Sequence, residues 1–81
     1  MKARTKEEKF LIALYETISA AGDFDTEVDR YLVGRKISLH DRGIDTICKE
    51  LAQTNFIKRH GPVMISITPN GKRLFDTLQS G

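Results

Sequence analysis

Apolar residues recur along much of the chain at the spacing of one helix face. Phe10, Leu11, Leu14 and Ile18 form such a stripe, which predicts a helix over residues 6–20. In the third predicted helix the stripe is Ile44, Ile47, Cys48 and Leu51. The same periodicity, read together with the boundary residues, predicts helices over residues 6–20, 27–33, 39–53 and 69–78.

Capping residues precede each of these segments. The first three starts fit a capping box or its aspartate variant, in which a hydroxyl accepts from an orphan backbone N–H and an acid follows three residues later. These pairs are Thr5 with Glu8, Thr26 with Asp29, and Ser38 with Asp41. Thr68 precedes Pro69, which is preorganised for the first helical position.

Glycines mark where the first two helices should end. Gly22 follows the first predicted helix, and Gly34 is placed to stop the second as a left-handed cap.

The hydrophobic pattern changes after Asn55, which suits the left-handed position that closes a helix. Residues 56–59 and 63–67 are rich in β-branched and apolar side chains, and His60-Gly61-Pro62 separates them. This predicts a β-hairpin, which must lie against the helices because an isolated hairpin is marginally stable.

Two stretches of the chain have a familiar pattern: residues 47–59, ICKELAQTNFIKR, and residues 65–74, ISITPNGKRL. In these stretches the chain resembles the winged-helix transcriptional regulators, particularly the MarR and PadR-like groups. Asn55 stands where these families usually have glycine, and the short tip at 60–62 differs from their long basic wings. The resemblance implies one α+β domain over residues 1–81, mostly helical, with a three-helix helix-turn-helix core, a short hairpin wing and a C-terminal helix.

In that fold the third helix enters the DNA major groove and the flanking basic residues bind phosphates. Arg42, Thr46, Lys49 and Gln53 share the stripe opposite the apolar one. Gly43 lies inside the third predicted helix, where it would allow close approach of DNA or close packing against the second helix. Lys2, Arg4 and Lys6 would form a basic arm, of which residues 1–4 are the flexible part. The predicted DNA-binding residues are Arg35, Lys36, His40, Arg42, Thr46, Lys49, Gln53, Lys58, Arg59 and His60.

The charge of the third helix favours a different function. Residues 38–53 carry Arg42 and Lys49 against Asp41, Asp45 and Glu50, which is two positive and three negative charges. Asp41 would serve as a cap, and Asp45 would pair with Arg42 and Lys49 along a solvated helix face. The alternative is therefore a protein-interaction module without DNA binding, and the first and last helices would allow a homodimer.

Composition excludes several other classes. The chain has 81 residues, a formal net charge of +2 and a single cysteine, Cys48, so it cannot form an intrachain disulfide. It has no apolar run of membrane-spanning length and no signal-peptide pattern, so we expect a cytoplasmic protein. His40 and His60 lack a metal-ligand spacing with Cys48. We expect no catalytic site, no cofactor, no metal and little room for a substrate pocket.

Overall fold

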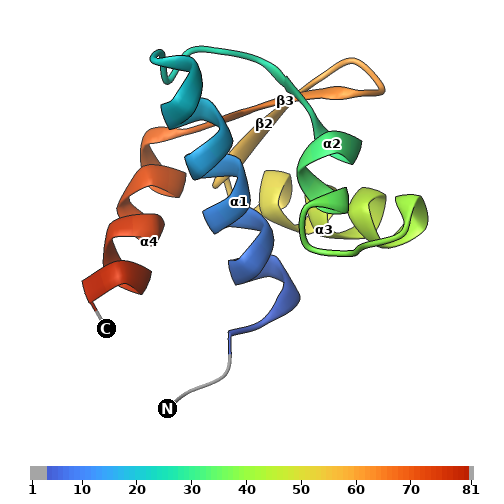
Figure 1. Ribbon diagram of the computed structural model, residues 1–81, viewed down its shortest axis with the longest axis horizontal. Coiled ribbons are helices and arrows are strands. Elements are labelled where there is room, and N and C mark those ends of the chain that lie inside the picture. Colours follow the sequence, from blue (N-terminus) through green and yellow to red (C-terminus); the bar gives the residue numbers. More distant parts are fainter. Residues whose placement is uncertain (1–3, 81) are drawn as a thin grey trace.

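The computed structural model describes residues 4–80, in which the chain forms four helices and three short strands. The helices are α1 (Lys6–Ala21), α2 (Arg30–Arg35), α3 (Asp41–Gln53) and α4 (Pro69–Ser80), and the strands are β1 (Val28–Asp29), β2 (Ile57–His60) and β3 (Met64–Ile67). The fold is α+β and mostly helical, as the sequence predicts. Helix α1 lies between α4 on one side and α2 with α3 on the other (Figure 1).

Helix α1 begins and ends where its sequence predicts. The Thr5 hydroxyl accepts from the Glu8 N–H at 3.1 Å, and the Glu8 carboxylate accepts from the Thr5 N–H at 2.8 Å. This closed capping box satisfies two backbone donors. Gly22, with φ of 86°, takes the left-handed position after the last turn. The predicted apolar stripe of α1 is buried in the core.

The predicted second helix begins too early. Val28 and Asp29 form β1, which pairs antiparallel with Ile65 and Met64 of β3. Asp29, not Thr26, caps α2, because its carboxylate accepts from the Tyr31 N–H at 2.8 Å. Leu32 is 55% exposed and so lies on the outer side of α2, although it is a large apolar residue.

Two predicted boundary features between α2 and α3 are also wrong. Gly34 is inside α2 rather than left-handed, and it is buried because the Ile44 side chain packs directly on its Cα. Ser38 does not cap α3: it takes the left-handed position itself, with φ of 63°, and α3 starts after His40 without a side-chain cap. The tight turn between α2 and α3 therefore depends on the left-handed backbone conformation of Ser38.

Strands β2 and β3 form the predicted hairpin, and β1 adds a third strand, giving the order β1-β3-β2. Asn55 is left-handed as predicted, with φ of 64°. Its carbonyl accepts from the Thr68 hydroxyl at 2.5 Å, and the same hydroxyl accepts from the Gly71 N–H at 3.1 Å. Thr68 thus starts α4 and ties it to the segment before the hairpin.

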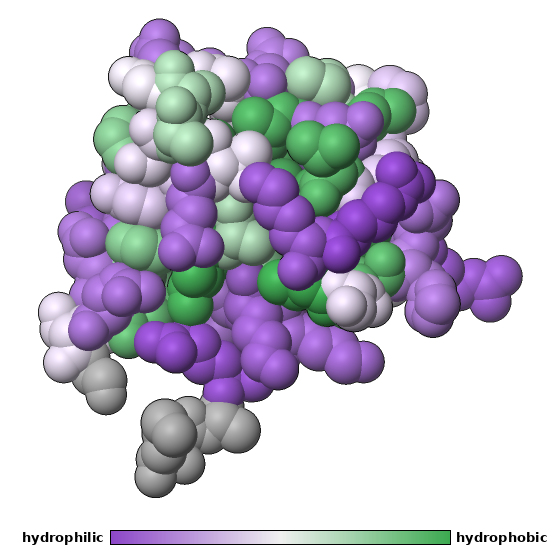
Figure 2. Space-filling model, viewed as in Figure 1, coloured by the Kyte–Doolittle hydropathy of each residue, from purple (hydrophilic) through white to green (hydrophobic). Residues whose placement is uncertain are grey.

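The core lies between α1, α3 and one face of the sheet. It contains the apolar stripes of α1 and α3, with Val33 of α2 and the sheet residues Ile57, Ile65 and Ile67. Tyr15 of α1 stacks on Phe75 of α4 with ring centroids 3.6 Å apart, so the first and last helices pack on each other within the chain. Apolar side chains reach the surface only as separate patches on the face in Figure 2.

Candidate nucleic-acid interface

Helix α3 has one buried face and one exposed face. Ile44, Ile47, Cys48 and Leu51 are buried, as the sequence predicts. The opposite face presents Arg42, Thr46, Lys49 and Gln53 to solvent, and all four are exposed. The Thr46 hydroxyl donates to the Arg42 carbonyl at 3.1 Å, a common bond within a helix.

Asp45 does not make the pairs predicted for it within α3. Its Oδ1 accepts from the Tyr31 hydroxyl at 2.7 Å and lies 3.9 Å from Nη1 of Arg30, both on α2. The hydrogen bond to Asp45 is the main cause that raises the pKa of Tyr31 above its usual value. Arg42 and Lys49 have no ion-pair partner among residues 4–80.

Sequence reasoning did not single out Arg30, which is only 5% exposed. Its Nε donates to the Val63 carbonyl and its Nη2 to the Gly61 carbonyl, each at 3.1 Å, and its backbone N–H also donates to Val63. One guanidinium therefore joins α2, α3 and the tip of the hairpin. Its position at the start of α2, with no apolar or motif context, gives no signal of this role.

The turn before α3 brings basic residues close to its first turn, but two of them have partners. Arg35 Nη2 lies 3.5 Å from Asp41 Oδ1, with both side chains exposed, so Asp41 pairs with α2 rather than serving as a cap. Lys36 Nζ donates to Thr17 of α1 at 2.8 Å. His40 is exposed and makes no side-chain capping bond. An exposed pair such as Arg35 with Asp41 contributes about 0–1 kcal/mol.

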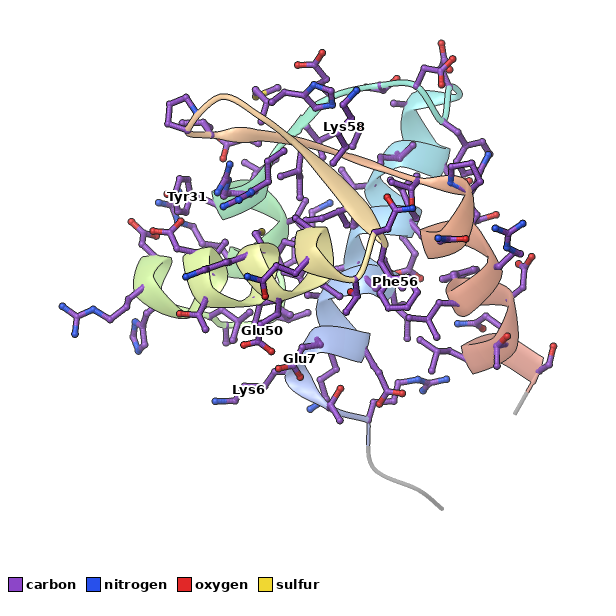
Figure 3. All side chains as sticks on the ribbon, turned by 180° about the vertical axis from the view of Figure 1, so that it is seen from behind. Lys6, Glu7, Tyr31, Glu50, Phe56 and Lys58 are labelled. Atoms are coloured by element: carbon purple, nitrogen blue, oxygen red, sulfur yellow. The ribbon has the colours of Figure 1, made fainter. Side chains whose placement is uncertain are left out.

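The hairpin does not bring its three predicted residues together. Successive side chains of a strand point to opposite faces. Arg59 shares the face of Ile57, on which α3 packs, whereas Lys58 pairs with Ser66 on the other face. Lys58 accordingly lies on the side of the hairpin away from α3 (Figure 3).

His60 is held within the sheet. Its Nε2 lies 2.8 Å from Oγ of Ser66, and its Nδ1 lies 3.8 Å from a carboxylate oxygen of Glu27. The His60 side chain is 27% exposed. It is positioned to fasten the hairpin to the segment before β1 rather than to reach along the surface toward α3.

Of the predicted basic arm, the structure describes Arg4 and Lys6. Arg4 donates to the Leu78 carbonyl at 3.0 Å, so this residue caps the end of α4 instead of extending freely. Lys6 is the first residue of α1. Lys2 lies outside the described residues.

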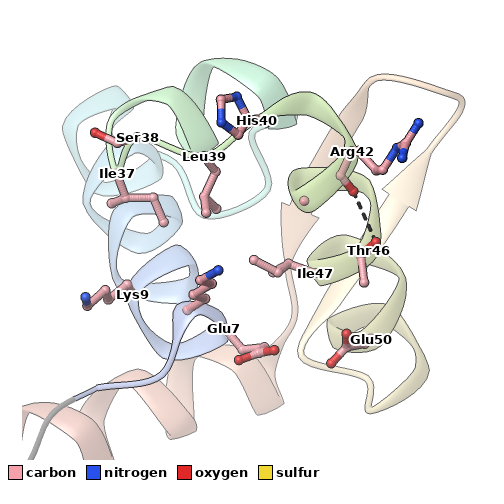
Figure 4. Close-up of a pocket in the computed structure, with 12 residues that line it drawn as sticks. Glu7, Lys9, Ile37, Ser38, Leu39, His40, Arg42, Thr46, Ile47 and Glu50 are labelled. Carbon is pink, nitrogen blue, oxygen red and sulfur yellow. Dashed lines mark hydrogen bonds between the residues drawn. The ribbon is translucent and has the colours of Figure 1, made fainter.

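A groove runs between the start of α1, the turn at residues 37–40 and α3, with a volume of about 720 Å³. Leu39 and Ile47 point into it from opposite sides, and Glu7 and Glu50 lie along one edge (Figure 4). The expectation of little room for a pocket is therefore wrong. The groove is lined by segments that are far apart in the sequence, the start of α1 and residues 37–50, and sequence spacing does not report how such segments pack.

Gly43 lines this groove, and a Cβ at this position would meet no atom within 4 Å. The predicted close packing of Gly43 against α2 is therefore wrong. We expect Gly43→Ala to raise the free energy of unfolding by about 0.5–1 kcal/mol, because alanine restricts the unfolded chain and favours the helix. Urea unfolding followed by circular dichroism measures this, and a loss of stability would mean that the position is not open.

Cys48 is buried on the apolar face of α3, and burial raises its pKa to about 11. A thiol in that state is neither a nucleophile nor a ready metal ligand near neutral pH. No group of three His, Cys, Asp or Glu side chains that could hold a metal ion occurs within residues 4–80. None of the helices in this part of the chain has the length and apolar character needed to cross a membrane.

Comparison of the chain with protein-family models, curated proteins and solved structures finds no match.

Proposed function

We propose that the chain is a winged-helix domain that binds duplex DNA, with α3 in the major groove. One observation carries the proposal: α3 exposes Arg42 and Lys49, while two of the three carboxylates on this helix, those of Asp41 and Asp45, are paired with side chains of α2. Arg35 forms an ion pair with Asp41. Asp45 forms an ion pair with Arg30 and accepts a hydrogen bond from Tyr31. The α3 face that would meet DNA therefore carries two cations, Arg42 and Lys49, that have no ion-pair partner within residues 4–80.

The order of elements supports the winged-helix assignment. Helices α2 and α3 follow each other through the tight turn at Ser38, as in a helix-turn-helix motif. The hairpin comes directly after α3, and β1 completes a small antiparallel sheet with it. In such domains the hairpin is the wing, and it lies beside the helix that enters the groove.

Charge supports the same surface. Asp41 and Asp45 are each paired with a cation of α2, so the charged side chains of α3 left without such a pair are Arg42, Lys49 and Glu50. Lys36 lies before its N-terminus, next to Arg35, whose charge is already paired with Asp41, and Arg59 lies on the sheet face that α3 packs against. Cations placed like this release counterions when they bind phosphates, which adds affinity without reading sequence. Lys58 and His60 are left out of this surface.

The test is a fluorescence-anisotropy titration of the protein with a labelled duplex at about 50 and 200 mM salt. We expect binding that weakens steeply with salt. Substituting Arg42→Ala and Lys49→Ala together should weaken binding about 10- to 100-fold, because each contact to a base edge or phosphate is worth about 1 kcal/mol or more.

Arg73→Ala is the matched control for charge. Arg73 is an exposed residue of α4, far along the chain from α3, and pairs with Asn70 of its own helix. Its loss should change affinity only slightly. Equal weakening by the α4 and α3 variants, or no binding of the parent at low salt, would contradict the proposal.

The groove favours a second candidate, a protein-interaction module. Its apolar floor is formed by Ile37, Leu39 and Ile47, and a groove of this size can take side chains of a partner. This candidate predicts no DNA binding at low salt and a complex larger than the monomer in light scattering. A monomer that binds DNA would count against it.

A further inference from the structure

Asp45 occupies an unusual position for an acidic residue near a DNA-binding face. It lies on the side of the exposed α3 face that borders α2 and the hairpin, three residues after Arg42 and four before Lys49. Its side chain is 54% exposed, although one of its oxygens is held by α2. DNA phosphates repel a carboxylate, so an exposed aspartate here weakens binding unless it meets a donor.

The carboxylate is fixed in orientation rather than free to rotate. Oδ1 accepts from Tyr31 at 2.7 Å and faces Arg30 at 3.9 Å. Arg30 is itself anchored, because its other nitrogens donate to the carbonyls of Gly61 and Val63. The second oxygen, Oδ2, has no hydrogen-bond partner within residues 4–80. An oriented group with one open acceptor loses little freedom when it binds, which favours its use in recognition.

The DNA edges offer few donors to such an acceptor. In the major groove only cytosine N4 and adenine N6 carry amino groups, and carboxylates characteristically accept from cytosine. In adenine the amino group lies beside N7, which is itself an acceptor. If Oδ2 accepted from the adenine amino group, N7 would face the carboxylate, and two acceptors repel each other. Cytosine has no acceptor of its own at that edge.

We propose that Asp45 is a specificity-determining residue that accepts a hydrogen bond from the amino group of a cytosine in the major groove. Tyr31 and Arg30 are its positioning residues. This inference rests on the proposed function, and it names one feature of the preferred DNA: a cytosine contacted by the side of α3 that borders the hairpin.

The experiment is selection of binding sites from a random duplex library with the parent, Asp45→Asn and Asp45→Ala, followed by titration of the selected site with each base at each position. One position should be cytosine for the parent, and changing it should cost about 5- to 100-fold in affinity. Asp45→Ala should reduce that preference below about twofold and bind random DNA more tightly, because a negative charge is gone. Asp45→Asn should lose the cytosine preference, because its oxygen stays with Tyr31 and its amide nitrogen donates where Asp45 accepts, which favours a base acceptor such as guanine O6 or N7.

The outcomes separate the two proposals. A parent that binds no duplex overturns the proposed function and this inference with it. A parent that binds DNA, with variants that change affinity for every sequence by the same factor, overturns the inference alone and leaves Asp45 a purely structural partner of Arg30. Should Asp45→Ala fail to fold, Asp45→Asn carries the test, because it retains an oxygen for the Tyr31 hydroxyl.

Tyr31→Phe tests the positioning role. It removes the 2.7 Å hydrogen bond without changing charge or any side chain of α3. We expect the cytosine preference to fall while the salt dependence of binding is unchanged, because the number of phosphate contacts is the same. An unchanged preference would show that Tyr31 does not orient the carboxylate.

Discussion

Replacing Arg30 with alanine should lower the free energy of unfolding by about 2–4 kcal/mol. The side chain is 5% exposed, so its truncation leaves the Gly61 and Val63 carbonyls without their guanidinium donors and opens space beneath the hairpin. An unsatisfied buried polar group costs about 1–3 kcal/mol, and loss of one partner from a buried charged network costs a similar amount or more. Asp45 is half exposed, so water compensates part of its loss.

Urea unfolding of parent and variant, followed by circular dichroism, gives this difference. Arg35→Ala is the matched control, since Arg35 is on the same helix and also faces an aspartate, but both partners are exposed. Its cost should stay below about 1 kcal/mol. Similar losses for the two variants would show that the buried network contributes no more than a surface pair.

Arg30 also connects stability to the proposed function. The hairpin tip has no other side-chain bond to α2 within residues 4–80, so we expect it to open locally in Arg30→Ala at a lower free energy than the helices. Hydrogen exchange at β3 should therefore increase more than exchange in α1. A hairpin that moves relative to α3 cannot present Arg59 and Lys49 to one duplex in a fixed arrangement.

Sequence reasoning predicted those features of the fold that depend on residues close together in the sequence. The capping box at Thr5, the left-handed Gly22 and Asn55, and the start of α4 at Pro69 each depend on residues within a few positions of one another. The apolar stripes of α1 and α3 follow from helical geometry alone. These features needed no knowledge of the tertiary structure.

Tertiary contacts decided the features that sequence reasoning missed. Strand β1 has two residues and leaves no periodic pattern, and it forms only because β3 is available to pair with it. In the sequence, Gly34 predicts the end of a helix. In the structure, glycine is required at this position because the Ile44 side chain packs on its Cα and leaves no space for a Cβ. Neither requirement is visible in the residues next to it.

In the candidate site, too, local features were predicted correctly and tertiary contacts were not. The exposed face of α3 was predicted correctly because the burial of one helical stripe fixes the opposite one. The partners of Asp41 and Asp45 were predicted wrongly, because sequence spacing reveals neighbours within a helix but not the residues of α2 across from them. Lys58 and Arg59 were grouped by adjacency, whereas a strand separates adjacent side chains onto two faces.

Gly71→Ala should lower the free energy of unfolding by about 3 kcal/mol, near the upper end of the usual cost of overpacking. Gly71 is buried in the first turn of α4. A Cβ there would overlap the Phe56 carbonyl oxygen and lie 2.7 Å from Cγ1 of Ile67. The Phe56 carbonyl cannot turn away easily, because it accepts from the Thr68 N–H at 3.2 Å.

The expected response is a shift of α4 away from the hairpin, which would also loosen the bonds of Thr68 to Asn55 and Gly71. Gly43→Ala is the matched control: the same substitution in another helix, at a position with open space, should stabilise the protein. Urea unfolding of both variants beside the parent gives opposite signs if close packing decides the outcome. A stabilised Gly71→Ala would mean that α4 can move off Phe56 at no cost, and that the glycine after Thr68-Pro69-Asn70 is not required by this contact.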